Sequence, residues 1–344
     1  GAARPVSGGL PGQSGLEPVN RWEIRVGDCL DLLRAMPDGS VNCVITSPPY
    51  WGLRDYGQDG QIGLEDSPAL YTAALTEVFR EVRRVLADDG TLWLNLGDSY
   101  AGSWGNQGRK EGRGTQREIN GEMITPVHDG RYPDKKTNTG AIPEGSGLKP
   151  KDLVGIPWTV AFALRDDGWY LRSDIIWAKP NPMPESIRDR PTKAHEQIFL
   201  LSKSPRYHFD ADAIAEPSVG TDAQPRFGGN KYGDDDRPES LTKSGNTYTD
   251  TGTRRKRTVW EVSSQPFSGA HFAVFPPNLV KPMILAGSKE GGTVLDPFAG
   301  SGTTGVVALR HDRDFIGLEL NPEYADLARL RIRDDAPLLN VEAA

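Results

Sequence analysis

The residues with the clearest chemical potential are at positions 47–50, where Ser-Pro-Pro-Tyr follows the apolar run 41–45. Prolines cannot continue a central strand, so the strand should end there in a rigid turn. The Ser47 hydroxyl and the Pro48 carbonyl can accept both hydrogens of a planar amine, which polarises its nitrogen and aims the lone pair. Tyr50 can stack on a base turned out of a duplex. The plainer alternative is a strand-ending turn with a core tyrosine.

A glycine-rich loop near the other end of the chain is a candidate cofactor site. Residues 296–305 read Asp-Pro-Phe-Ala-Gly-Ser-Gly-Thr-Thr-Gly, between a short apolar run and a predicted helix. Glycines let the backbone turn sharply and approach a ligand, and free amides at the helix start favour its anionic end. Glu319 follows Asp296 by 23 residues, and an acid at that spacing can accept from both ribose hydroxyls.

The form of this loop favours S-adenosylmethionine over a nicotinamide dinucleotide. Four residues precede the first glycine, and too few residues follow the loop for a second nucleotide-binding half. Asp296 is expected to hold the methionyl ammonium directly or through water, and Thr303 to donate to the carboxylate. A nicotinamide-dependent oxidoreductase, or a turn that only packs a strand on a helix, remains open at this point.

Hydrophobic periodicity predicts alternating strands and helices that position both motifs. This rhythm favours a parallel sheet wrapped by helices, with the strand at 195–201 paired to its predecessor as a hairpin. The predicted strands are residues 22–27, 41–45, 91–96, 169–177, 195–201, 293–295 and 314–318. The predicted helices are residues 30–36, 68–87 (ended by Asp-Asp-Gly at 88–90), 157–166, 277–286, 303–310 and 322–333.

The composition of the 344 residues limits the remaining possibilities. The net charge of −7 argues weakly against a nucleic-acid partner, but local patches decide binding. Basic runs at 109–117 and 254–257 are candidate DNA contacts, with solvated loops as the alternative. Two cysteines, Cys29 and Cys43, suit buried thiols in a reducing cytoplasm. No Cys/His cluster has metal-ligand spacing and no stretch is long enough for a membrane span.

Together the two motifs resemble the signature pair of the amino-group DNA methyltransferases of the beta arrangement, in which the catalytic motif precedes the cofactor loop. Residues 26–29 (Val-Gly-Asp-Cys) resemble the family segment that supports the cofactor adenine, with Asp28 as acceptor. Residues 271–276 resemble the stretch that closes over the methionine end. Residues 176–181 and 189–192 are also similar to family segments, without an assigned chemistry.

The resemblance implies an α/β fold: a Rossmann-like, seven-stranded, mostly parallel sheet with helices on both faces, one antiparallel hairpin strand and a circularly permuted motif order. It also implies a small loop-rich target-recognition region. The expected organisation is a flexible leader (1–20), a catalytic half (21–100 and 151–204) interrupted by an inserted loop (101–150), the target-recognition region (205–265) and a cofactor-binding half (266–344).

The implied activity is sequence-specific DNA methylation on an exocyclic amine of a flipped base, with S-adenosyl-L-methionine as cofactor. In this family Ser at position 47 favours cytosine N4, whereas Asp favours adenine N6. No cysteine lies in the turn, so a covalent enzyme–base adduct is not expected. The expected partners are double-stranded DNA and a cognate restriction endonuclease, with the chain a monomer or homodimer. An RNA or protein-amide methyltransferase and a non-catalytic DNA-binding regulator remain alternatives.

Three sets of site residues follow from the motifs and the resemblance. The predicted catalytic residues are Ser47, Pro48, Pro49 and Tyr50. The predicted cofactor-binding residues are Asp28, Cys29, Phe272, Asp296, Phe298, Ala299, Gly300, Ser301, Gly302, Thr303, Thr304 and Glu319. The predicted DNA-binding residues are Trp51, Arg109, Lys110, Arg113, Arg254, Arg255, Lys256 and Arg257. No metal site is predicted.

Overall fold

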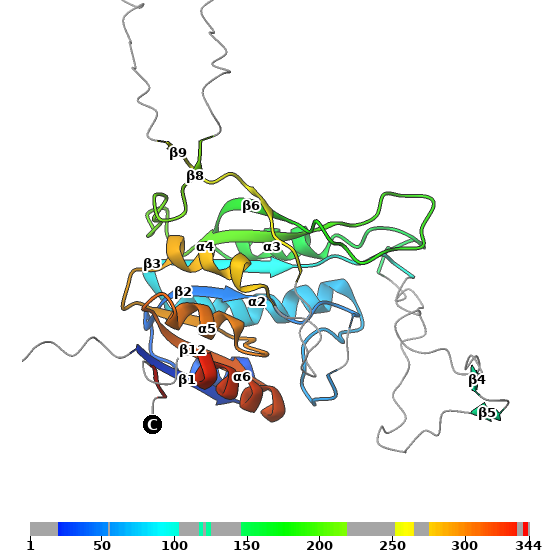
Figure 1. Ribbon diagram of the computed structural model, residues 1–344, viewed down its shortest axis with the longest axis horizontal. Helices are drawn as coiled ribbons and strands as arrows, with labels where there is room; N and C mark the ends of the chain where they lie inside the picture. The colour runs from blue at the N-terminus through cyan, green and yellow to red at the C-terminus, as the bar shows by residue number, and fades with distance from the viewer. Residues whose placement is uncertain are drawn as a thin grey trace, which may run out of the picture.

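The computed structural model describes residues 20–53, 56–102, 117–119, 122–124, 146–218, 252–264, 275–335 and 340–342. Nine strands of this part of the chain form one sheet: β1 (Asn20–Val26), β2 (Val41–Thr46), β3 (Leu86–Leu96), β6 (Tyr170–Ala178), β7 (His195–Ser202), β10 (Val259–Glu261), β11 (Thr293–Asp296), β12 (Asp314–Glu319) and β13 (Asn340–Glu342). Their order across the sheet is β10-β6-β7-β3-β2-β11-β12-β1-β13 (Figure 1).

The strand directions confirm the predicted mostly parallel sheet. Within the described chain, β7 runs antiparallel to both neighbours, β3 and β6, and the other ladders of the sheet are parallel. The predicted hairpin is therefore confirmed. The expected number of seven strands was too low, because β10 and β13 add an edge strand at each side. Each has only three residues, too few to show a period in the sequence.

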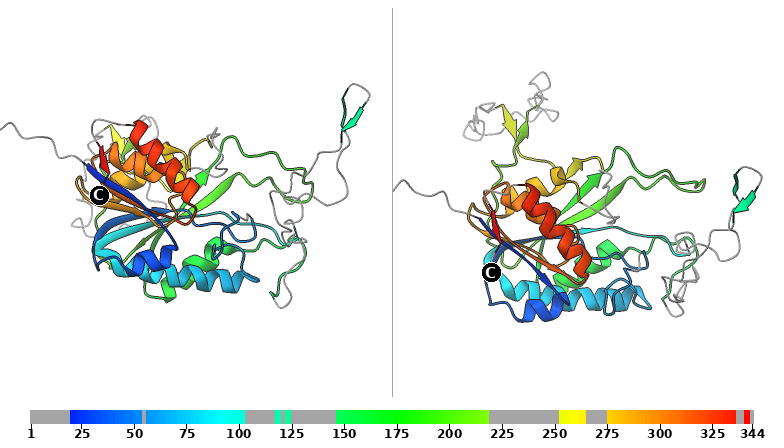
Figure 2. Two further views of the ribbon diagram at one scale, coloured as in Figure 1. Left: turned by 90° about the horizontal axis from the view of Figure 1, so that it is seen from below. Right: turned by 60° about the horizontal axis from the view of Figure 1, so that its bottom comes forward.

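Helices cover both faces of this sheet, as predicted (Figure 2). Side chains of α1 (Cys29–Arg34), α2 (Pro68–Val85) and α3 (Ile156–Asp166) belong to one buried apolar cluster. Side chains of α4 (Pro277–Gly287), α5 (Thr303–Leu309) and α6 (Pro322–Asp335) belong to a second cluster on the opposite face. The two layers leave the strand ends, rather than the faces, open to ligands.

The end of α2 differs from the sequence prediction. The Ser67 hydroxyl caps its start, as expected, but the helix ends at Val85 and the Asp-Asp-Gly at 88–90 lies inside β3. Leu86 is fully buried and pairs with Val41 in the sheet, so it is extended. A Cβ at Gly90 would lie 2.6 Å from the Leu86 side chain and 2.9 Å from the Asn42 carbonyl oxygen, so glycine here serves strand packing rather than a helix stop.

The two motifs end on neighbouring strands. Strand β11 pairs with β2 through Val294–Cys43 and Leu295–Val44, and both strands run in the same direction. Residues 47–50 and the loop that begins at Asp296 therefore leave the sheet side by side. Because β7 is antiparallel, it contributes its first residues to this same edge of the sheet.

Two smaller strand pairs modify the expected organisation. Strand β4 (Arg117–Ile119) pairs with β5 (Glu122–Ile124) within the range expected to be an inserted loop. Strand β8 (Glu216–Pro217) pairs with β9 (Thr253–Arg254) in the expected target-recognition range. The target-recognition range also supplies β10, whose Trp260 is 4% exposed. The C-terminal part of this range therefore packs in the same buried cluster as α4, α5 and α6. Among the described residues, no helix has the length and apolar character needed to cross a membrane.

Candidate active site

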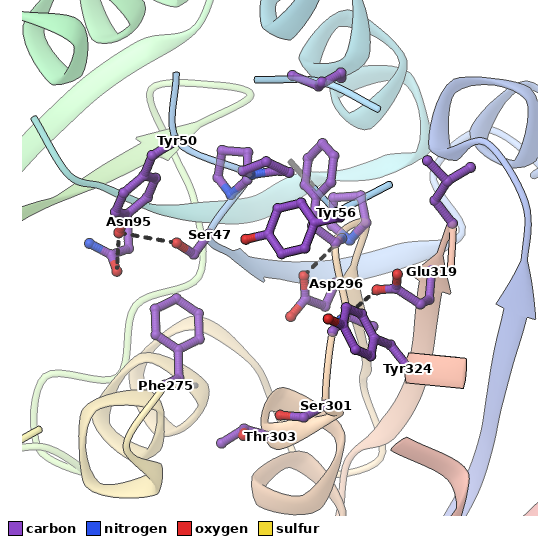
Figure 3. Close-up of a pocket in the computed structure, with 18 of the residues that line it drawn as sticks. Ser47, Tyr50, Tyr56, Asn95, Phe275, Asp296, Ser301, Thr303, Glu319 and Tyr324 are labelled. Atoms are coloured by element: carbon purple, nitrogen blue, oxygen red, sulfur yellow. Dashed lines mark hydrogen bonds between the residues drawn. The ribbon is translucent and has the colours of Figure 1, made fainter. Parts of the chain in front are cut away.

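A cavity of about 430 Å³ opens at the sheet edge where the two motifs meet (Figure 3). Many of the residues that line this cavity were predicted from the sequence. Those lining it are Asp28, Cys29, Ser47, Pro48, Pro49, Tyr50, Asp296, Phe298, Ala299, Gly300, Ser301, Thr303, Thr304 and Glu319. Gly302 lies behind the lining, and Phe272 is outside the described residues.

Asp296 joins the cofactor loop to the strand that carries the turn. Its Oδ1 accepts hydrogen bonds from the Thr46 hydroxyl at 2.7 Å and the Phe298 amide at 3.1 Å. Its Oδ2 accepts from the Thr304 hydroxyl at 2.7 Å. The side chain is only 3% exposed, so these bonds fix the carboxylate while leaving acceptor capacity toward the cavity.

The glycine-rich loop is held from behind by α6. Gly300 and Gly302 have φ of 52° and 76°, and a Cβ at Gly302 would lie 2.8 Å from the Ala328 Cβ. Glycine is therefore required at position 302 for both conformation and space. The Arg331 guanidinium donates to the Ser301 carbonyl at 2.5 Å and to the Thr303 hydroxyl at 3.2 Å, which orders the start of α5.

Two further carboxylates are oriented at the cofactor end of the cavity. Glu319 accepts from the Gly300 amide at 2.8 Å and the Asn321 amide at 2.9 Å, and burial raises its pKa. Asp28 caps α1 by accepting from the Leu30 amide at 2.9 Å. Both retain acceptor capacity for ligand hydroxyls or amines. Burial raises the pKa of Cys29 to about 12, so its thiol is neutral and offers apolar contact only.

An aromatic group that the sequence analysis missed completes this end of the cavity. Tyr56 and Tyr324 both line it and meet edge to face, with ring centroids 6.4 Å apart. Phe275 was also missed and lines the cavity beside the predicted Phe298; Figure 3 shows Phe275 facing the cavity from below Ser47. These residues occur in loops and at helix starts, where no periodic pattern marks an aromatic side chain as lining a cavity.

The buried position of Asp296 predicts a pH-dependent affinity for the cofactor. Burial raises the pKa of Asp296 from 3.8 to about 6, despite the hydroxyls of Thr46 and Thr304. The protonated form must lose its proton to pair with the methionyl ammonium, so we expect S-adenosylmethionine to bind about tenfold more weakly at pH 5 than at pH 7.5. Calorimetry at the two pH values measures this change in affinity. In the Asp296→Asn variant, the part of the pH dependence that the Asp296 carboxyl causes should disappear.

The same shift has a defined sign for the stability of the free protein. A carboxyl whose pKa is higher in the folded than in the unfolded chain stabilises the fold at low pH. That contribution is complete below 3.8 and is lost as the pH rises through about 6, and its size is about 3 kcal/mol. A cofactor cation paired with Asp296 restores favourable electrostatics for the ionised form at neutral pH.

The Ser-Pro-Pro-Tyr turn is fixed by hydrogen bonds that do not use the Ser47 hydroxyl oxygen or the Pro48 carbonyl oxygen. The Pro49 carbonyl accepts from the Tyr71 hydroxyl at 2.8 Å, and Gly52 donates to the Gly63 carbonyl at 2.8 Å. Within the described part of the chain, the Pro48 carbonyl accepts no hydrogen bond. It therefore has full acceptor capacity beside the Ser47 hydroxyl, as an amine-polarising pair requires.

Tyr50 belongs to a polar network that extends to two other strands. Its hydroxyl donates to Glu196 Oε2 at 2.7 Å and accepts from the Ser47 hydroxyl at 3.3 Å. Asn95 Nδ2 donates to the same Glu196 oxygen at 3.1 Å, and Lys179 pairs with Glu196 Oε1. Burial, followed by the charge of Glu196, raises the pKa of Tyr50 well above its ordinary value, so the phenol keeps its proton.

Asn95, Lys179 and Glu196 all line the cavity and were not predicted as site residues. Asn95 was detectable as a polar residue within the apolar run 91–96, near the carboxyl end of a predicted parallel strand. Glu196 lies at the beginning of its strand, whereas binding sites in parallel sheets are expected at the carboxyl ends of the strands. The sequence therefore gave no reason to select it. Its position became visible only through the antiparallel direction of β7.

Gly97 provides a test of how closely the Tyr50 ring must be placed. A Cβ at this position would lie 2.3 Å from Tyr50 Cε2, so Gly97→Ala must displace the ring. We expect a loss of at least tenfold in the rate of the chemical step, since about 1 Å of misplacement can cost that much or more. Cofactor affinity measured by calorimetry should change less than twofold, and a Gly97→Ala enzyme with the parental rate would contradict this placement.

The predicted DNA-binding residues fare differently from the cavity residues. Trp51 is only 4% exposed and donates to the Glu65 carbonyl at 2.9 Å. It belongs to the same buried apolar cluster as the side chains of α2, so its prediction as a DNA-binding residue is wrong. Arg254 and Arg257 pair with Glu216 at 3.1 and 2.8 Å.

The other basic residues are either absent from the cavity lining or outside the described residues. Lys256 lies 5.1 Å from the centroid of the Trp260 ring, and Arg255 is exposed. None of the residues 254–257 lines the cavity. Arg109, Lys110 and Arg113 lie outside the described residues, and their predicted DNA contacts stay predictions.

The open, mostly parallel sheet, the glycine-rich loop at its carboxyl edge and the Ser-Pro-Pro-Tyr turn on the adjacent strand have the arrangement of a Rossmann-like methyltransferase site. The DNA methylase family that comprises the N6 and N4 amino-methyltransferases matches residues 41–330, and the chain belongs to this family. This membership confirms the predicted class of enzyme and S-adenosylmethionine as the methyl donor. It also identifies DNA as the substrate class.

Individual relatives agree with this assignment over nearly the whole chain. The Type II methyltransferase M.Cfr9I of Citrobacter freundii is 47% identical over 325 residues, which cover 92% of this chain and 90% of the relative. The Type II methyltransferase M.SmaI of Serratia marcescens is 46% identical over 310 residues, 90% of each chain.

Solved structures share the fold at lower identity. The cytosine-N4-specific PvuII DNA methyltransferase superposes with a TM-score of 0.57 at 18% identity, covering 95% of this chain and 98% of that chain. A DNA modification methylase of Thermus thermophilus, TTHA0409, complexed with S-adenosyl-L-methionine, has a TM-score of 0.55 at 24% identity and covers 93% of this chain and 96% of that chain.

Proposed function

We propose that this enzyme methylates the N4 amine of a cytosine that it flips out of double-stranded DNA at a specific sequence. The observation that carries the proposal is the presence of Ser47 and Pro48 in the lining of the same cavity that Asp296 and Glu319 also line. Residues of the cofactor loop would hold S-adenosylmethionine, which would supply the methyl group and leave as S-adenosylhomocysteine. Ser47 and Pro48 would hold the target amine, which would release one proton to solvent as it is methylated.

The recessed position of Ser47 and Pro48 supports base flipping. Ser47 is partly buried and Pro48 is buried, so an amine within a stacked duplex does not reach them. Flipping costs a few kcal/mol, which stacking in the pocket must recover. Tyr50, Phe275 and the lining residues of the turn supply apolar faces for this purpose. The buried thiols of Cys29 and Cys43 lie outside the turn, so transfer is direct.

The preference for cytosine rests on the residue at position 47. Serine supplies a neutral acceptor, and in the family resemblance this residue favours cytosine N4 whereas aspartate favours adenine N6. The alternative is therefore adenine N6 with the same cofactor, turn and geometry. Digestion of DNA methylated by the enzyme, followed by mass spectrometry of the nucleosides, separates the two: N4-methylcytosine supports the proposal and N6-methyladenine overturns it.

We also propose a biological role for the enzyme and a region that reads its target sequence. The relatives named as Type II methyltransferases suggest a modification enzyme paired with a restriction endonuclease. Residues 205–265 are proposed to read the target, with the basic run 254–257 contacting phosphates and guanine edges. Sequencing of modified bases in DNA from expressing cells gives the site, and light scattering distinguishes a monomer from a homodimer.

One assay distinguishes the proposed DNA substrate from RNA, from protein and from a non-catalytic role. Methyl transfer from labelled S-adenosylmethionine is measured on duplex DNA, RNA and protein under the same conditions. Transfer to duplex DNA alone supports the proposal, whereas preferred transfer to RNA or protein contradicts it. DNA binding without transfer to any substrate indicates a regulator that has kept the fold.

A further inference from the structure

The Ser47 hydroxyl can act as a hydrogen-bond donor or as an acceptor toward the cavity, and its position alone does not decide between the two. A serine hydroxyl both donates and accepts, but the proposed reaction requires its oxygen to accept from the target amine. The hydroxyl hydrogen must therefore be directed elsewhere. Within the described residues, the Ser47 side chain has one hydrogen-bond partner, the Tyr50 hydroxyl at 3.3 Å.

Glu196 determines what the Tyr50 hydroxyl can do. An ionised carboxylate is an acceptor only, so at 2.7 Å the phenol must donate its single hydrogen to Glu196 Oε2. Asn95 Oδ1 is a second acceptor near the phenol, at 3.3 Å, and is the weaker competitor because it is neutral and more distant. With its hydrogen used, the Tyr50 oxygen can only accept, and Ser47 donates to it.

Neighbouring groups hold Glu196 in this role. Lys179 pairs with Oε1 and lies 4.2 Å from the centroid of the Trp177 ring. Asn95 Nδ2 donates to Oε2 at 3.1 Å and to the Gln197 carbonyl at 3.0 Å, which sets its amide orientation. The side chains of Lys179 and Glu196 are 21% and 15% exposed, so this ion pair is shielded from most solvent screening.

We propose that Glu196, held by Lys179, is a positioning residue that directs the hydroxyl hydrogens of Tyr50 and Ser47 away from the cavity, so that the Ser47 oxygen accepts from the target amine. The inference rests on the proposed function and assigns the polarity of its acceptor pair. Every bond of the chain then points the same way: amine to Ser47, Ser47 to Tyr50, and Tyr50 to Glu196. The negative charge that orients these hydroxyl hydrogens thus belongs to Glu196 on β7, whereas Ser47 and Tyr50 follow β2.

Glu196→Gln tests this polarity with little change in shape. The amide can turn its NH₂ group to the Tyr50 oxygen, which allows Tyr50 to donate to Ser47 and Ser47 to donate into the cavity. We expect the single-turnover methylation rate to fall about tenfold to a hundredfold. The dissociation constants for S-adenosylmethionine and DNA should change less than twofold. Asp174→Asn, an exposed carboxylate on the same β6–β7 hairpin, should retain the parental rate and is the matched control.

A double-mutant cycle shows whether Glu196 acts through Tyr50. Tyr50→Phe removes the hydroxyl and keeps the ring, and should itself slow single turnover by a similar factor. In the Tyr50→Phe background, Glu196→Gln should cost less than twofold more, because the chain is already broken. A multiplicative loss in the double variant would overturn the proposal, as would a parental rate in either single variant or a loss confined to DNA affinity.

The outcomes also separate this inference from the proposed function. Absence of methyl transfer by the parental enzyme on all substrates defeats the function and the inference with it. Transfer to a base amine by the parental enzyme, with an unaffected Glu196→Gln variant, defeats the inference alone. If Glu196→Gln unfolds, as judged by circular dichroism, Tyr50→Phe decides: a parental rate overturns the proposal and a slowed rate with unchanged cofactor affinity supports it.

Discussion

Replacement of Ser47 by alanine is expected to lower the rate of methyl transfer about a hundredfold, while S-adenosylmethionine binds within twofold of the parental affinity. The change removes one of the two acceptors that polarise the amine, and one preorganised hydrogen-bonding group at a reacting centre contributes about this much. The cofactor loop is untouched, because its carboxylate is held by Thr46 and Thr304 rather than by Ser47.

Single-turnover kinetics with saturating cofactor and DNA measure this effect without product release. Ser40→Ala is the matched control, since this exposed serine precedes the same strand at its far end and its hydroxyl donates only to the Pro37 carbonyl among the described residues. A parental rate in Ser47→Ala would remove the hydroxyl from the mechanism. A fall in rate explained wholly by weaker cofactor binding would assign Ser47 to the wrong half of the cavity.

Replacement of Asp296 by alanine is expected to weaken S-adenosylmethionine binding about a hundredfold or more. Loss of one partner of a buried charge pair costs about 2–5 kcal/mol, and the variant also leaves the hydroxyls of Thr46 and Thr304 without their acceptor. These buried donors make the variant less stable by about 1–3 kcal/mol each where no water replaces the carboxylate. Affinity should therefore fall strongly, whereas the melting temperature should fall by less than these two lost hydrogen bonds alone would cause, because the variant also removes a buried charge that is unfavourable at neutral pH.

Calorimetry with S-adenosylmethionine measures the affinity, and thermal denaturation without cofactor measures the stability. Asp166→Ala is a suitable control, because this carboxylate is 71% exposed and, among the described residues, pairs only with Arg165 on the surface of α3. Asp296→Asn separates charge from hydrogen bonding: it should recover most of the stability and little of the affinity. Equal losses of cofactor affinity in the Ser47 and Asp296 variants would contradict the assigned division between the two motifs.

Much of this fold could be predicted because its elements are locally encoded. The helix that follows Ser67 and the strands around residues 44 and 295 carry periodic or continuous apolar patterns that survive without tertiary information. Adjacent parallel strands then bring their carboxyl ends together. The cavity residues of both motifs followed from that geometry and from a family resemblance with short, specific motifs.

The errors arose where tertiary pairing overrides a local pattern. A glycine after an apolar helical pattern, as at Gly90, is typical of a helix end, yet pairing of Leu86 with Val41 draws residues 88–90 into β3. Trp51 follows the turn directly, yet α2 buries it. Neither outcome depends on local sequence alone, since each is decided by which strand or helix lies alongside.

Glu196 was missed for a topological reason. Its contribution depends on an antiparallel strand whose first residues share an edge with the last residues of β2 and β3, a relation that exists only after the sheet has formed. Lys179 was within a segment similar to the family, but similarity assigned it no partner. Contacts between such distant positions carry no signal in a single sequence.

The hydrogen bond from Thr46 to Asp296 restricts how this enzyme can be re-engineered. Thr46, which precedes the proposed catalytic Ser47, donates to the carboxylate of Asp296, which is proposed to bind the methyl donor, so the two motifs form one unit rather than exchangeable parts. A catalytic turn grafted from a relative with a different target amine will keep donor affinity only if the graft begins after position 46 or brings a hydroxyl there. Swaps that respect this boundary can alter the acceptor chemistry while leaving the methyl-donor pocket intact.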